Sequence, residues 1–177
     1  LFADDTTLYD SDECLDKLIE IFSINVSTLI DWTMLNRLSI NWSKTKAMII
    51  LPKRKCKLVW NKKLNEIKLL NISNFSVEFV FEFKLLGIVL DEFLSFEKHY
   101  MLIKKNVNAR LYSLHKNFLI PIETKVQFFK TFLLPFFDYC SSLFIYMCKT
   151  LLNRFNRFFN CCIFRLFKLN LHNMNIN

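Results

Sequence analysis

Residues 74–91 read NFSVEFVFEFKLLGIVLD, and this stretch decides the fold class. Between residues 77 and 84 apolar and charged side chains alternate, and this period of two predicts a half-buried β-strand. Residues 85–90 are almost all apolar and predict its hairpin partner across a turn. Gly87, the only glycine in the chain, lies in this segment. A β-hairpin is therefore expected near the middle of the chain.

The segments before this hairpin predict a helix and further strands. Residues 1–9 are apolar or β-branched around two aspartates and favour a short hairpin. Apolar residues then recur every three or four positions over residues 15–30, which predicts an amphipathic helix that ends near Asn36. A strand is predicted over residues 44–51. It should end there, because Pro52 has no N–H to donate to a neighbouring strand.

The segments after the hairpin predict helices alone. The first spans residues 96–118, and the second follows Pro121 and runs to a break or kink at Pro135. The third spans residues 150–167. Its apolar side consists of Leu151, Phe155, Phe158, Cys162 and Leu166. Because strands and one helix come first and helices alone follow, the sequence predicts an α+β fold.

The composition limits the possible partners. The 24 Lys+Arg against 16 Asp+Glu give a net charge of +8, which favours a polyanion such as nucleic acid or an acidic membrane surface. The stretches without charge are shorter than the roughly 20 residues of a bilayer span, so no transmembrane helix is expected. The 6 cysteines form no C-x-x-C pair, which disfavours structural zinc and favours a reduced, intracellular protein. Without a starting Met or a signal-like segment, the chain is expected to be a fragment.

Asp4 and Asp5 are the main candidates for chemistry. Neighbouring side chains on a strand point to opposite faces, so these two converge only if the backbone turns between them. Two close carboxylates raise each other's pKa unless a cation lies between them, and their hard oxygens suit Mg²⁺. With a third carboxylate they could hold two ions for phosphoryl transfer. A solvated turn is the alternative for a bare Asp-Asp pair.

The flanks of this pair resemble a known motif. FADDT at residues 2–6 resembles the catalytic hairpin of reverse transcriptases. LSINWSKTKAMII at residues 38–50 is similar to the next motif in enzymes of LINE-type, non-long-terminal-repeat retrotransposons, including jockey-like elements. FKLLGIVLDEFLSFEKHY at residues 83–100 is similar to their primer-grip hairpin and its exit into the thumb. The three motifs occur along this chain in the same order as in the family.

Two later segments extend the resemblance. LLPFFDYCSSLF at residues 133–144 and LLNRFNRFFNCC at residues 151–162 resemble downstream helices of the same family. Together the motifs cover most of residues 1–51 and 83–165, whereas the basic segment 53–66 is unmatched. The resemblance implies an incomplete antiparallel polymerase palm over residues 1–93, followed by an all-helical thumb over residues 94–177.

The resemblance also implies an activity and its partners. The intact protein would be an RNA-directed DNA polymerase that uses two Mg²⁺ or Mn²⁺ ions. Its partners would be an RNA template, a DNA primer and deoxynucleoside triphosphates. It would act in the nucleus and would not bind a membrane. The family's other catalytic Asp and its fingers lie upstream of the motif at Asp4 and Asp5. We therefore expect this chain alone to be inactive, because two carboxylates are too few for a two-ion site.

Carried over by position, the resemblance assigns roles to single residues. Asp4 and Asp5 become the catalytic metal ligands, and Phe2 and Ala3 line the site of the primer end. Lys44 would lie near the incoming triphosphate, although a solvated lysine at a strand start fits equally well.

The remaining assignments concern the nucleic acid itself. The primer-gripping turn would consist of Leu86, Gly87 and Ile88, where glycine permits a close backbone approach. A plain hairpin turn is the alternative. Cations on the first late helix would contact phosphates, unless they are merely solvated. These are Lys98, Lys104, Lys105, Arg110 and Lys116.

Two functions other than polymerisation stay open. The chain could be a nucleic-acid-binding module that has lost its chemistry, or a decayed remnant of such an element. His99 and His115 are isolated in the sequence and are expected to be surface or hydrogen-bonded residues, not metal ligands.

Overall fold

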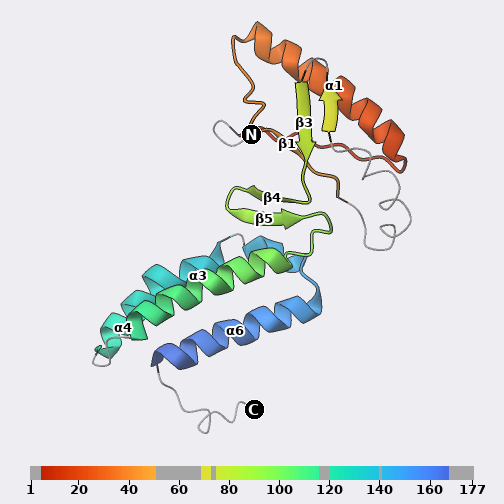
Figure 1. Ribbon diagram of the computed structural model, residues 1–177. Helices are drawn as coiled ribbons and strands as arrows, with labels where there is room; N and C mark the ends of the chain where they lie inside the picture. Colours follow the sequence, from red (N-terminus) through yellow and green to blue (C-terminus); the bar gives the residue numbers. More distant parts are fainter. Residues whose placement is uncertain (1–4, 51–68, 73–74, 116–119, 140, 168–177) are drawn as a thin grey trace. The chain divides into compact units, whose positions relative to one another are not determined.

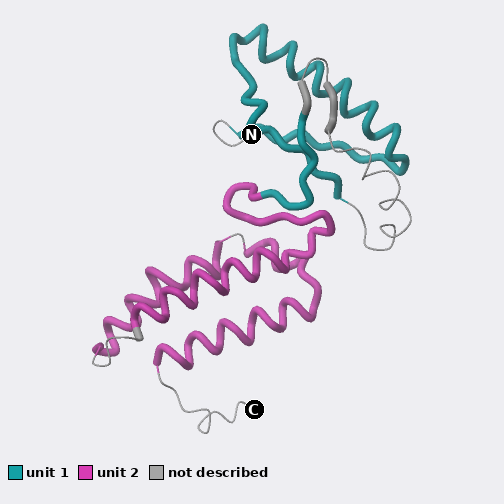
Figure 2. Tube along the Cα trace, in the orientation of Figure 1, with its two compact units in different colours: residues 1–83 teal, residues 84–177 magenta. Residues whose placement is uncertain are grey.

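A computed structural model describes most of the chain, in two compact units (Figures 1 and 2). The described residues are 5–50, 69–72, 75–115, 120–139 and 141–167. The units comprise residues 1–83 and 84–177, so they divide earlier than the expected boundary after residue 93. Both helices and small sheets are present, which confirms the α+β class in general.

The first unit is built around the helix α1, Leu15–Leu35. Its limits agree with the predicted helix, and its apolar spacing places Val26 and Ile30 in a small core with Val77. The hairpin expected over residues 1–9 is not confirmed. Asp5 forms a single bridge, and residues 6–9 are exposed without strand pairing. Residues 1–4 lie outside the described part of the chain.

Composition alone would allow α1 to cross a membrane. The helix has 21 residues and a mean hydropathy of 1.3 over its most apolar window, although the sequence led us to expect no such helix. The core helix of a soluble protein meets the same criterion. Val26 and Ile30 of α1 pack onto Val77, but only 11% of this window is buried, so the expectation of no membrane-spanning helix stays a prediction.

The sheet of the first unit is mixed. β3, Phe75–Phe79, lies between β1, Lys46–Ala47, and β2, Leu69–Ile72. β2 runs antiparallel to β3, as expected for this sheet, whereas β1 runs parallel to β3, so the expected antiparallel arrangement is wrong for β1. An ion pair of 2.6 Å between Lys46 Nζ and Glu78 Oε2 joins the parallel strands.

Two strand predictions need correction. The strand expected over residues 44–51 is only the two residues of β1, because the preceding turn takes up the N–H groups of Lys44 and Thr45. The continuous strand expected over residues 77–84 is in fact β3 and a separate strand β4, Glu82–Leu85. The chain changes partners between them, since β3 pairs with β1 and β2, whereas β4 pairs with β5, Ile88–Asp91.

The second unit is mainly helical, as the sequence predicted. Its helices contact one another through a core that contains Val107 and Leu133, both fully buried. The apolar side predicted for the last helix is buried residue for residue. The helical segments are α3, Glu97–His115; α4, Ile122–Phe128; a π-helical turn, Phe129–Leu133; α5, Leu134–Asp138; a 3₁₀ turn, Ser141–Ile145; and α6, Lys149–Phe167.

The break or kink predicted at Pro135 corresponds to a π-helical turn directly before this residue, and the chain does not leave the helical conformation there. The π-helical turn precedes this proline, and the N–H of Leu134 donates to the carbonyl of Phe129, five residues back. Pro135 then occupies the first turn of α5, where its missing N–H needs no partner. The chain therefore stays helical as far as Asp138.

Candidate nucleic-acid interface

The turn between β4 and β5 has an unusual backbone. Leu86 has φ 46° and Gly87 has φ 86°. Positive φ at both central residues is typical of the two-residue turns that match the twist of a hairpin. Glycine adopts this conformation freely, whereas leucine is strained in it. The turn lies where the sequence predicted it, and Ile88 begins the strand that follows.

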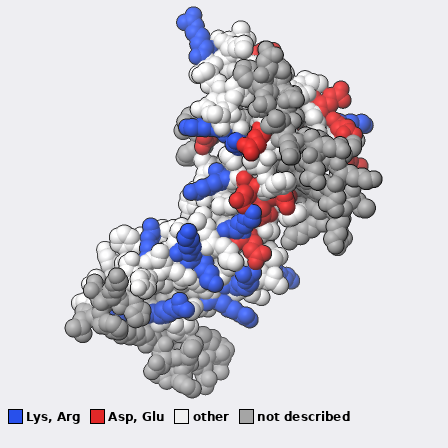
Figure 3. Space-filling model, in the orientation of Figure 1, with Lys and Arg blue, Asp and Glu red and all other residues white. Residues whose placement is uncertain are grey.

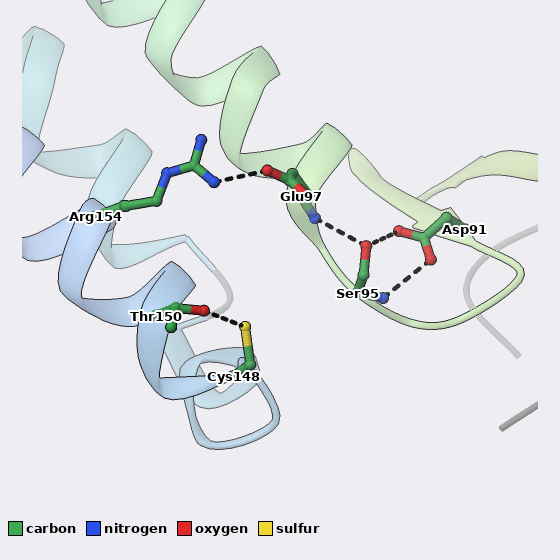
Figure 4. Close-up of polar contacts among 6 residues, drawn as sticks. All are labelled: Asp91, Ser95, Glu97, Cys148, Thr150 and Arg154. Carbon is green, nitrogen blue, oxygen red and sulfur yellow. Dashed lines mark hydrogen bonds and ion pairs between the residues drawn. The ribbon is translucent and has the colours of Figure 1, made fainter. Parts of the chain in front are cut away.

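Polar contacts join β5 to the turn that follows it and to α3. Asp91, at the end of β5, is buried, and its Oδ1 accepts the N–H of Ser95 at 3.0 Å (Figure 4). The same oxygen accepts the N–H of Phe93 at 3.0 Å. Its Oδ2 accepts the Ser95 hydroxyl at 2.7 Å. Val89 in β5 donates its N–H to Nδ1 of His99 in α3, at 3.5 Å. The strand is thus tied to the first turns of the helix.

Both of these groups have shifted pKa values. Burial acts to raise the pKa of Asp91, but hydrogen bonds from Ser95 and Phe93 and the charge of Lys98 outweigh it, so the pKa is lowered. Burial alone lowers the pKa of His99. The neutral ring can accept the Val89 N–H, which confirms that His99 is a hydrogen-bonded residue.

An exposed ion pair joins α3 to α6. Arg154 Nη1 lies 2.6 Å from Glu97 Oε1 (Figure 4). The guanidinium is 5.4 Å from the centre of the Tyr100 ring. Hydrogen bonding to Glu97 raises the pKa of Arg154. This arginine is therefore engaged in a contact within the unit.

The predicted phosphate-contacting cations differ in their surroundings. Lys104 and Lys105 are exposed on α3. Arg110 is also exposed, but it donates to the carbonyl of Phe132 at 3.1 Å and lies over the Phe136 ring at 4.1 Å. These contacts give Arg110 a role in holding α3 against the π-helical turn. Lys98 contributes to the charge around Asp91. Lys116 lies outside the described residues.

The net positive charge belongs entirely to the second unit. Residues 84–177 contain 13 Lys+Arg and 5 Asp+Glu, a difference of +8. Residues 1–83 contain 11 of each, a difference of 0. Lys and Arg side chains accordingly appear over the helical unit in the space-filling view (Figure 3). A polyanion would be attracted to this unit and not to the first.

The predicted catalytic pair is described only in part. Asp5 is exposed, whereas Phe2, Ala3 and Asp4 lie outside the described residues. Among the described residues, no group of three His, Cys, Asp or Glu side chains could hold a metal ion. The carboxylate oxygens of Asp5 suit Mg²⁺ chemically, but a single exposed carboxylate does not form a metal site.

Lys44 lies in a turn that fixes its backbone. Its N–H donates to the Oδ1 of Asn41 at 3.3 Å and to the Asn41 carbonyl at 3.2 Å, and its side chain is exposed. The described residues do not bring Lys44 into a site with Asp5, so its role near a triphosphate stays a prediction.

Sequence reasoning gave no role to Asp91 or Tyr139. Asp91 ends a strand four residues before Ser95 at a helix start, which is a spacing typical of a side chain that bonds the following turn. Tyr139 offered no such signal, because its partner, Leu86, is distant in the sequence. In comparisons with known proteins, no family model, curated protein or solved structure matches the chain.

Proposed function

We propose that this chain is part of a reverse transcriptase of the LINE type, and that its second unit binds the duplex of RNA template and DNA primer. The resemblance of the ordered motifs supports the family. The observation that carries the binding role is the charge difference between the units, 0 in the first and +8 in the second. The basic unit is the one that contains the hairpin and the helices similar to a thumb.

The physical basis of this binding is electrostatic. A duplex carries a dense row of phosphates, and cations that neutralise them release condensed counterions, which favours binding without reading the sequence. The exposed ammonium groups of Lys104 and Lys105 on α3 suit this task. The buried apolar side of α3 keeps the helix fixed while its other side meets the solvent.

For catalysis we propose the roles that the resemblance implies. Asp4 and Asp5 would hold Mg²⁺ or Mn²⁺ together with a further Asp from upstream in the intact protein. When bound, the ions would activate the attacking hydroxyl and stabilise the leaving oxygen. Residues 1–177 alone should then fail to extend a primer on an RNA template, and robust synthesis would contradict this assignment.

Titration of a fluorescent RNA–DNA duplex with the protein tests the binding role. We expect affinity to fall steeply with salt, with a slope of log K against log salt that equals about −0.9 for each phosphate neutralised. Duplexes of different sequence should bind equally. Absence of binding at low salt, or binding insensitive to salt, would refute the proposal.

A module that binds nucleic acid without chemistry is the second candidate, since the same charge distribution supports it. The polymerase and the binding module predict different coding sequences upstream of residue 1. An intact reading frame that encodes a further Asp-bearing strand and fingers favours the polymerase. A stop codon or frameshift there favours a binding module or a decayed remnant.

A further inference from the structure

The Leu86–Gly87 turn needs support from outside its own hairpin. A leucine at φ 46° is strained, and a two-stranded hairpin is at best marginally stable alone. The turn is also exposed, with Leu86 41% accessible. Something must therefore hold it in this conformation.

Tyr139 provides a contact of the required kind. Its hydroxyl donates to the carbonyl of Leu86, 53 residues earlier in the sequence. Its ring lies beside the turn, so that a Cβ added at Gly87 would lie 3.4 Å from Tyr139 Cε1 and 3.5 Å from its Oη. These distances are ordinary van der Waals contacts, so the ring lies directly against the turn, and it is the φ of 86° that favours glycine at this position.

The helical unit fixes Tyr139 in turn. This residue directly follows α5, and its N–H donates to the carbonyl of Pro135. Two residues earlier, Phe137 is buried and packs with Phe155 and Phe159. Tyr139 itself is 51% exposed, so it contributes little to that core. Its side chain is anchored by its backbone and directed at the turn.

We propose that Tyr139 is a positioning residue that holds the Leu86–Gly87 turn in the shape that receives the end of a primer strand. This inference rests on the proposed function, because the ligand of the turn is the primer. Tyr139 acts through the turn: its hydroxyl fixes the Leu86 carbonyl, and its ring limits the movement of Gly87.

Tyr139→Phe tests the hydroxyl, because it removes the hydrogen bond and keeps the ring. Affinity is measured for two RNA–DNA duplexes of equal length, one with a recessed primer 3′ end and one with blunt ends. We expect the unmodified protein to prefer the recessed end and the variant to lose about threefold to tenfold of that preference, while its affinity for the blunt duplex is unchanged. Exchange of the amide hydrogens of residues 85–89 should also accelerate.

Tyr146→Phe is the matched control, since Tyr146 is an exposed tyrosine of the same unit, 74% accessible. It should leave the preference and the exchange unchanged. A Tyr139→Phe protein with the full preference overturns the positioning role. Equal weakening for both duplexes also overturns it, because that result indicates a general structural role. If the unmodified protein binds neither duplex, the proposed function itself fails.

Discussion

The two compact units differ in their cores and in their charge. Among the described residues, the second unit buries a cluster that extends from Phe96 to Leu166, whereas the first buries only Val26, Ile30 and Val77 in one cluster. All of the net positive charge lies in the second unit. The better-packed unit is thus the one with the surface for a polyanion.

This difference shows where the chain can hold a binding surface in a fixed shape. In the second unit, polar contacts at Asp91, His99 and Tyr139 join the hairpin to helices that share a large core. In the first unit, α1 exposes large apolar side chains such as Ile24, Met34 and Leu35. The second unit also exposes large apolar side chains, such as Ile145, and such exposure favours association with other apolar surfaces, so we expect low solubility of the whole chain.

The largest difference between the two units should appear in the free energy of unfolding that core substitutions cost. Leu133→Ala removes a fully buried side chain and should lower the free energy of unfolding by about 4 kcal/mol, because a cavity forms among tightly packed neighbours. Ile30→Ala should cost about 2 kcal/mol, since the smaller cluster can collapse onto the gap. Urea unfolding followed by circular dichroism measures both. Equal losses would show that the first core is as well packed as the second.

Carboxylates near helix starts offer a second contrast. Asp91 is buried and accepts three hydrogen bonds, so Asp91→Ala should cost about 2 kcal/mol. Asp12, exposed before α1, accepts one bond from the Cys14 N–H, and Asp12→Ala should cost about 0.5 kcal/mol. Because the pKa of Asp91 is lowered, its contribution is present above pH 3.8 and is lost as the pH falls below it. A cost for Asp91→Ala no larger than that for Asp12→Ala would contradict this account.

Mild acid should destabilise the second unit alone. All 3 histidines lie in it, and burial lowers the pKa of His99 below 6.5. The unfolded chain then binds more protons at this position just below pH 6.5, so the free energy of unfolding decreases as the pH falls through that value. His99→Gln keeps an acceptor for the Val89 N–H and should remove much of this dependence in thermal unfolding. If the pH dependence of unfolding is unchanged in His99→Gln, it originates from groups other than His99.

The smallest expected effect concerns single lysines at the surface. Lys104→Gln should reduce the magnitude of the salt slope for duplex binding by about 1, because one phosphate contact is lost. Lys17→Gln, an exposed lysine on α1 of the first unit, should leave the slope unchanged. An identical change in both variants would remove the distinction between the units.

The helices were predictable because their information is local. Spacing of three and four residues indicated α1, α3 and α6, and even the buried residues of α6. The strands depended on distant partners: β1 is short and parallel to β3, which no local pattern indicated. Pro135 indicated an irregularity in the helix, but no local pattern indicated that it would be a π-helical turn. In the candidate site, the position of the turn was predictable from Gly87, but the contact from Tyr139 required the fold.

Hydrogen–deuterium exchange with and without an RNA–DNA duplex would locate the binding surface. We predict slower exchange in the hairpin of β4 and β5 and over α3 when the duplex is added, with no change in α1. The protection should disappear at high salt, as expected for contacts to phosphates. Protection confined to α1, or none in either unit at low salt, would contradict the assignment of nucleic-acid binding to the basic helical unit.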